Sequence, residues 1–193
     1  MANPNAPYGL KPVRHLQGGT IRMSEGFTIA NAYATALAVG DLVAKTGTGT
    51  DIQVAVNGVG GVKAIGVFAG CKYRDTLGNI YYRSIWPAAQ ATFNSEGATA
   101  FVYDDPEIVY KVRASAGLVA ADIGQFAGYT VGSPNTALGV SQGKLDSADI
   151  TGTLDNLKII NLLRTSNNDY GSFAEVEVLL AWHEYNFQNI AAS

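Results

Sequence analysis

The stretch AIGVFAGCKYRDTLGNIYYRSIWP, residues 64–87, decides the fold class of this chain. Apolar or aromatic residues occupy every second position from Ile65 to Tyr73, a period of two that is typical of a strand with one buried face. The turn-forming segment DTLGN then leads into residues 80–87, which are rich in aromatic and β-branched residues. Two such segments predict a β-hairpin that ends at Pro87. The residues expected to face inward are Ile65, Val67, Ala69, Cys71 and Tyr73, and the alternate residues, Phe68 among them, are expected to face outward.

The same period recurs along most of the chain. Residues 98–114 repeat the hairpin pattern, with a tight turn expected at DDPE, residues 104–107. Residues 156–164 and 174–187 are expected to form the last pair of strands. In the final strand we expect an inward face of Val176, Val178, Leu180 and Trp182, and an outward face that includes Glu175, Glu177 and His183.

Short strands at regular spacing, with turn signals between them, predict an all-β fold: an antiparallel β-sandwich of jelly-roll type. The abundance of glycine, 22 residues, suits the bulges and corners of such a fold. The only helix that the sequence suggests is a short one at residues 86–93.

Composition narrows the class of protein. A hydrophobic share of 47% with 15% charged residues indicates an ordered domain, and 193 residues suit one domain with an arm. No apolar stretch approaches the ~20 residues that span a bilayer, so no membrane association is expected. A single cysteine excludes an internal disulfide framework, which fits synthesis in a reducing cytoplasm. Lysine and arginine are too sparse for nucleic-acid binding.

The N-terminal segment MANPNAPYGLKPVRHLQGG, residues 1–19, differs from the rest. Its prolines at positions 4, 7 and 12 favour an extended chain, and it lacks the periodicity of a helix or strand. Residues 1–24 contain three basic residues and no acidic one, although the whole chain has a net charge of −3. We therefore expect an extended arm, residues 1–19, on a single β-sandwich domain, residues 20–193, with an acidic partner near the arm.

No motif in the sequence indicates catalysis. His15 and His183 are expected at the surface, and Cys71, on an inward strand face, is expected to act as a small hydrophobic residue. The chain lacks the nucleotide-binding, calcium-binding and serine-nucleophile motifs. We expect no catalytic residue, cofactor or metal. A glycosidase that uses Asp104 and Glu107 remains an alternative, because the distance between two carboxylates cannot be deduced from the sequence.

Three blocks of the sequence resemble the cement, or decoration, proteins of tailed double-stranded DNA bacteriophages. They are the N-terminal residues 1–19, the hairpin of residues 64–87, and NNDYGSFAEVEVLLAWHEY, residues 167–185. The resemblance implies a structural virion protein, made in the host cytoplasm, that binds the outer surface of the mature capsid and staples neighbouring major capsid protein subunits. It also implies a homo-oligomer, for which we expect a trimer, with a dimer as the alternative.

The resemblance gives the arm a role as the segment that binds the capsid or a sister subunit. A carbohydrate-binding β-sandwich of a phage particle, with exposed tyrosine and tryptophan side chains on the sugar, is the alternative function. The residues expected to contact the partner are Pro4, Pro7, Tyr8, Leu10, Lys11, Pro12 and Arg14, with Tyr8 and Leu10 in shallow apolar sites and Lys11 and Arg14 beside carboxylates.

Overall fold

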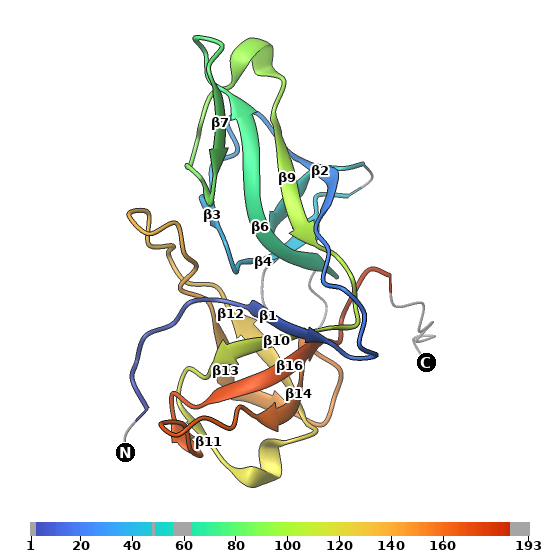
Figure 1. Cartoon of the computed structure of the whole chain (residues 1–193), viewed down its shortest axis with the longest axis vertical. Coiled ribbons are helices and arrows are strands. Elements are labelled where there is room, and N and C mark those ends of the chain that lie inside the picture. The colour runs from blue at the N-terminus through green and yellow to red at the C-terminus, as the bar shows by residue number, and fades with distance from the viewer. Residues whose placement is uncertain (1–2, 48, 56–62, 186–193) are drawn as a thin grey trace.

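The computed structural model describes residues 3–47, 49–55 and 63–185. Their regular structure is almost entirely β, and every strand ladder is antiparallel (Figure 1). The described helical segments are two three-residue 3-10 turns, η1 (Phe93–Ser95) and η2 (Ala120–Asp122). The all-β prediction is therefore confirmed. The short helix expected at residues 86–93 is wrong, because this segment contains the end of β8 and a turn before η1 begins.

The lower sheet in Figure 1 contains six strands and curls back on itself. Its last strand, β13, returns to the chain that follows β10, where Ala114 and Leu145 form a bridge and the Ser115 N–H donates to the Leu145 carbonyl at 2.9 Å. The strands in spatial order are β1 (Lys11–His15), β10 (Ile108–Arg113), β16 (Glu175–Leu180), β14 (Leu157–Leu162), β12 (Phe126–Thr130) and β13 (Lys144–Thr151).

The upper sheet also curls, since the chain beside its last strand, β5, meets β2 at a Thr28–Asp51 bridge. A sixth strand, β7 (Ile80–Arg83), pairs with the upper part of β6. The other strands in spatial order are β2 (Ser24–Ile29), β9 (Ala98–Tyr103), β6 (Ala64–Arg74), β4 (Leu42–Lys45) and β5 (Ile52–Val54). Two short ladders complete the described strands: β3 (Leu37–Ala38) with β8 (Ile85–Trp86), and β11 (Gly117–Leu118) with β15 (Gly171–Ser172). The jelly-roll part of the prediction stays a prediction.

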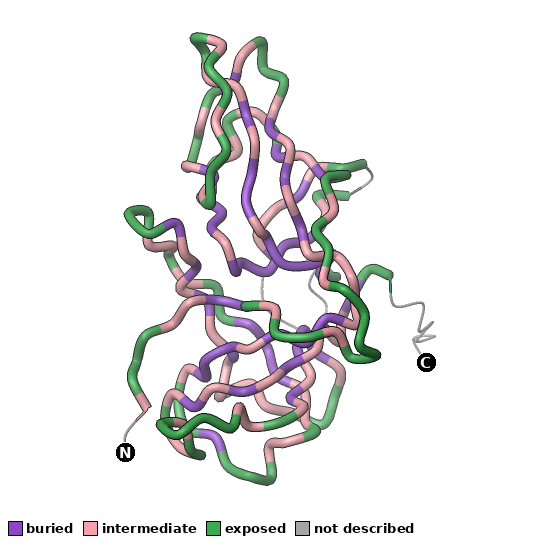
Figure 2. Tube along the Cα trace, in the orientation of Figure 1, coloured by how far each residue is buried: buried purple, intermediate pink, exposed green. Residues whose placement is uncertain are grey.

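Two hydrophobic clusters share β4 and β6 as a common wall. Val67 packs into the lower cluster, whereas Ile65 and Phe68 pack into the upper one. Figure 2 shows the resulting buried residues along β6. The outward position expected for Phe68 is therefore wrong, because β6 is covered on both faces and a register shift lies between Phe68 and Gly70. Ala69, expected in the core, is only half-buried.

Of the two hairpins predicted near the middle of the chain, the structure contains one. Residues 64–83 form the predicted hairpin, whose turn is held by Asp75, since its Oδ1 accepts the N–H groups of Leu77 and Asn79, each at 2.9 Å. The hairpin expected at residues 98–114 is wrong. There β9 belongs to the upper sheet and β10 to the lower one, so residues 104–107 cross between the sheets.

The last strand pair is confirmed, with β14 and β16 antiparallel and Val176, Val178 and Leu180 buried. The alternation stops where β16 ends, at Leu180. Beyond that point Trp182 is only half-buried, and His183 is 1% exposed rather than at the surface. Burial lowers the pKa of His183 to about 4, so this imidazole is neutral near pH 7.

Candidate interaction surface

The first part of the expected arm lies on the chain's own lower sheet. The side-chain amide of Asn3 donates to the carbonyls of Asp169 at 2.8 Å and Ser172 at 3.0 Å. The Pro4 carbonyl accepts a hydrogen bond from Arg113, and the Pro7 carbonyl accepts one from the Gln142 amide at 3.4 Å. These bonds hold residues 3–7 along one side of the lower sheet.

Tyr8 lies at the centre of a compact polar cluster. Its hydroxyl donates to Glu175 Oε1 at 2.7 Å, and Arg113 Nη2 donates to the same oxygen at 2.6 Å. The ammonium groups of Lys11 and Lys111 lie 4.5 and 5.5 Å from the centroid of the Tyr8 ring. Burial, and then the hydrogen bond to Glu175, raise the pKa of Tyr8 above its usual range, so its hydroxyl remains a donor.

Leu10 is a core residue of this chain, with 1% of its surface exposed. The chain reaches the core by crossing close to Gly40, whose carbonyl accepts the Leu10 N–H at 2.8 Å. Gly9 has φ of +71°, and a Cβ at this position would lie 2.5 Å from Gly40 O, so the crossing requires glycine. The expectation that Leu10 fills a shallow site on a partner is therefore wrong.

Residues 11–15 form β1, the outermost strand of the lower sheet. Lys11 and Pro12 lie opposite Lys111 and Tyr110 of β10. The Arg14 guanidinium lies 3.1 Å from Glu177 Oε2, and the Arg14 side chain remains 44% exposed. The carboxylate expected beside Arg14 on a partner is thus supplied by the chain itself.

The exposed part of this region is residues 13–23, which we call the edge segment. It begins on β1, which among the described strands has a neighbour, β10, on one side only. Val13, Leu16 and Met23 are 40%, 47% and 53% exposed, and Arg22 adds a positive charge. Sequence reasoning singled out Val13 and Leu16 as isolated apolar anchors of the arm but missed Met23, which follows neither periodicity. The available signal was the presence of large apolar residues in a segment with no predicted core face.

The acidic residues 104–107 have local structural roles. Asp105 Oδ1 accepts the Glu107 N–H at 2.8 Å, as the sequence predicted for a turn, and Asp105 Oδ2 lies 3.1 Å from His15 Nε2. Glu107 accepts a hydrogen bond from the Gln17 amide at 2.7 Å. Burial raises the pKa of Asp104. The acidic side chains of this segment are thus engaged by contacts within the chain, Asp105 and Glu107 through the bonds above and Asp104 through Ser24.

Cys71 is fully buried, as the sequence predicted, and burial raises the pKa of its thiol to about 12. Its Sγ donates to the Ile85 carbonyl at 3.7 Å. Within residues 3–47, 49–55 and 63–185 no three His, Cys, Asp or Glu side chains are grouped as metal ligands. The helical segments in the same ranges include none long and apolar enough to cross a membrane.

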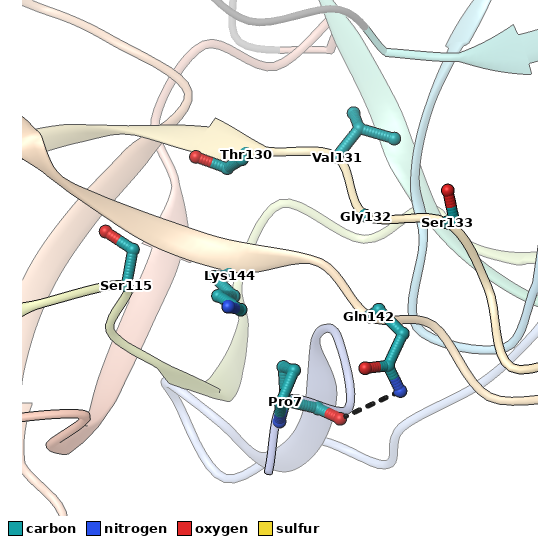
Figure 3. Close-up of a pocket in the computed structure, with 8 residues that line it drawn as sticks. All are labelled: Pro7, Ser115, Thr130, Val131, Gly132, Ser133, Gln142 and Lys144. Carbon is teal, nitrogen blue, oxygen red and sulfur yellow. Dashed lines mark hydrogen bonds between the residues drawn. The ribbon is translucent and has the colours of Figure 1, made fainter. Parts of the chain in front are cut away.

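Two hollows flank the first part of the arm. One, of about 440 Å³, lies between Pro7 and the facing ends of β12 and β13, and Lys144, Gln142 and hydroxyl groups line it (Figure 3). The other, of about 510 Å³, lies beside Tyr170, Arg164 and Asp169. The first has no aromatic side chain in its lining, whereas the second offers Tyr170 as a surface on which a ring could stack.

Comparison of the chain with protein-family models, with curated proteins and with solved structures found no match.

Proposed function

We propose that this chain is a structural protein that binds the outer surface of a mature phage capsid and links neighbouring capsid subunits. The edge segment, residues 13–23, is the contact surface. The exposure of Val13, Leu16 and Met23 in one continuous segment is the observation that carries the proposal. The resemblance of residues 1–19, 64–87 and 167–185 to phage cement proteins supports the same function.

The first part of the arm has a supporting role in this proposal. Residues 3–10 are held by the chain's own sheet through Asn3, Tyr8 and Leu10. This attachment orders the edge segment before a partner arrives, and a preorganised segment loses less conformational entropy on binding. The apolar side chains supply most of the binding free energy, because exposed ion pairs contribute only about 0–1 kcal/mol each.

Repetition of the contact explains how a small surface stabilises a shell. A protein that binds only the mature lattice adds its binding free energy to that state. Each copy makes modest contacts, but many equivalent positions on the lattice are occupied at once. No bound cofactor enters this mechanism.

The abundance of the chain in purified virions tests this function. Quantitative mass spectrometry is expected to detect it at a fixed, high ratio to the major capsid protein, in the range of hundreds of copies per particle. Its absence from virions, or its presence at only a few copies, contradicts the proposal.

The role of the edge segment is tested by Leu16→Asp and Met23→Asp. Both positions are exposed, so the fold is expected to persist while capsid binding is greatly weakened. Val119→Asp is the matched control, because Val119 is 59% exposed and lies beside η2, outside the edge segment. Equal binding by all three variants excludes the edge segment as the contact.

A carbohydrate-binding module is the second candidate function. The hollow beside Tyr170 favours it, since an aromatic ring, a guanidinium and a carboxylate line that hollow together. A glycan array in which the wild type binds a sugar and Tyr170→Ala does not would support this function over capsid binding.

A further inference from the structure

The outer edge of β7 is an open strand edge in the upper sheet. β7 pairs with β6 in a continuous register, from Ile80 opposite Arg74 to Arg83 opposite Cys71. In the part of the chain that the structure describes, no backbone hydrogen bond joins the other edge of β7 to any residue. Its unpaired N–H and C=O groups are therefore a template for another strand.

Other edges of the two sheets are protected, and β7 is not. β1 carries Pro12 and a register shift between Pro12 and Arg14, and β2 has a register shift between Ser24 and Phe27. The edge of β13 is bridged to Ala114 through Leu145. Proline, bulges and covered edges are the usual protection against edge-to-edge pairing. β7 contains no proline and no bulge.

The side chains along this edge are apolar and exposed. Ile80 and Tyr82 lie on the same face of β7 and are 57% and 68% exposed. Leu77, in the turn before β7, is 84% exposed. A hollow of about 320 Å³ lies beside the end of β7, between residues 82–85 and residues 136–139, and Leu138 at its wall is 71% exposed.

We propose that β7 pairs antiparallel with β7 of a second copy of this chain, about a two-fold axis at Tyr81. In this register each Ile80 lies opposite Tyr82 of the second copy, and each Asn79 lies opposite Arg83 of the second copy. The pairing joins the two upper sheets into one continuous sheet.

This register makes the edge self-complementary. An aliphatic β-branched residue facing a tyrosine is a favourable cross-strand pair, and the two-fold axis creates it twice. Arg83 approaches the turn of the second copy, where Asp75 holds Asn79 through bonds of 2.9 and 3.1 Å, so a guanidinium comes near a carboxylate. No like charges lie opposite each other between residues 79 and 83.

The open part of this edge ends at Arg83. Ser84 O already accepts the Val39 N–H at 3.0 Å, and Ile85 already lies opposite Ala38 of β3. The pairing between the two copies is therefore confined to residues 79–83. A two-fold dimer corresponds to the alternative oligomer that the sequence left open.

Sedimentation equilibrium of the full chain tests the pairing. The wild type is expected to show a dimer mass at about 100 μM, a concentration chosen for a contact of micromolar affinity. The double variant Ile80→Lys/Tyr82→Lys is expected to show the monomer mass with an unchanged circular dichroism spectrum. Val119→Lys, at a position of similar exposure, is the control and is expected to remain a dimer. A wild type that is monomeric at this concentration overturns the proposal, and so does a double variant that is folded and dimeric.

Cysteine cross-linking tests the register independently of affinity. Residues directly opposite in an antiparallel pair have Cα atoms about 4.5–5.5 Å apart, within the range that a disulfide spans. Under oxidation, a mixture of Asn79→Cys and Arg83→Cys proteins is expected to form a cross-linked dimer. Neither variant alone is expected to form a cross-linked dimer. Two copies of position 79, or two copies of position 83, lie four residues out of register, about 13 Å apart. Cross-linking of either variant alone, or none in the mixture, contradicts the register. Capsid binding enters neither experiment, so these results do not depend on the proposed function.

Discussion

Glu175 is the residue on which the attachment of the N-terminal arm depends. Its carboxylate accepts hydrogen bonds from Tyr8 and Arg113, and the side chains of Arg113 and Glu175 are only 10% and 15% exposed. Glu175→Ala leaves the Arg113 charge buried without its partner and is expected to cost about 3–5 kcal/mol of unfolding free energy. Urea denaturation measures this loss.

The exposed ion pair of Arg14 with Glu177 is the control for that substitution. Arg14→Ala is expected to cost less than about 1 kcal/mol, because the Arg14 side chain is 44% exposed and water screens the pair. Similar losses for Glu175→Ala and Arg14→Ala would contradict the structural role assigned to the Tyr8 cluster.

His183 makes stability depend on pH. Burial lowers its pKa from 6.5 to about 4 in the folded chain, so between these values the unfolded chain binds more protons than the folded one. Stability is therefore fully present above pH 6.5, falls as the pH drops towards 4, and levels off below 4. The loss is on the order of 3 kcal/mol, since one pKa unit corresponds to about 1.4 kcal/mol.

A comparison with His183→Gln isolates this contribution from that of the carboxyl groups. The difference in unfolding free energy between wild type and variant is expected to change between pH 6.5 and 4. Parallel curves for the two proteins over that interval would show that His183 does not titrate as the buried geometry requires.

At the scale of elements, β1 is part of the fold rather than an appendage. Leu10, just before β1, is in the lower core, and its replacement by alanine is expected to cost about 2–5 kcal/mol. For a chain of this size, each kcal/mol lowers the melting temperature by about 2–4 °C. Deletion of residues 1–19 is therefore expected to lower the melting temperature, contrary to what a free arm predicts.

Val13→Ala is the matched control, because Val13 lies on the same segment but is 40% exposed. Differential scanning calorimetry compares the melting temperatures of Leu10→Ala, Val13→Ala and the chain without residues 1–19 with that of the wild type. The comparison shows whether residues 1–19 belong to the fold or form a free arm. An unchanged melting temperature after deletion would mean that residues 1–19 are a detachable arm.

Sequence periodicity predicted strands well where one face is buried, as in β16. It failed where a strand is covered on both faces, as in β6. There the period of two assigns Phe68 to the outward face, although Phe68 is buried. It also failed at residues 104–107, since a turn between two strands of one sheet and a crossing between two sheets have the same turn residues. Arg14 was predicted to lie beside a carboxylate, whereas Tyr8 was predicted to fill an apolar site and instead donates a hydrogen bond to Glu175. Their partners Glu177 and Glu175 lie more than 160 residues away, and local patterns carry no such information.

At the scale of the whole molecule, the two proposed surfaces lie on different sheets. The edge segment begins on the lower sheet, and the open edge of β7 belongs to the upper one. A dimer formed through β7 therefore leaves both edge segments free, and two lattice contacts in one dimer bind more tightly than either alone when geometry allows both. Loss of dimerisation through Ile80→Lys/Tyr82→Lys is expected to weaken capsid binding without abolishing it.

Direct binding to purified capsids tests the central claim most directly. The measurement is co-sedimentation of the purified chain with expanded and unexpanded capsids, titrated to saturation. We predict saturable binding to expanded capsids at a fixed ratio to the major capsid protein, little binding to unexpanded ones, and loss of binding for Leu16→Asp/Met23→Asp but not for Val119→Asp. Failure of the folded wild-type chain to bind expanded capsids, or undiminished binding by the edge-segment variant, would contradict the account.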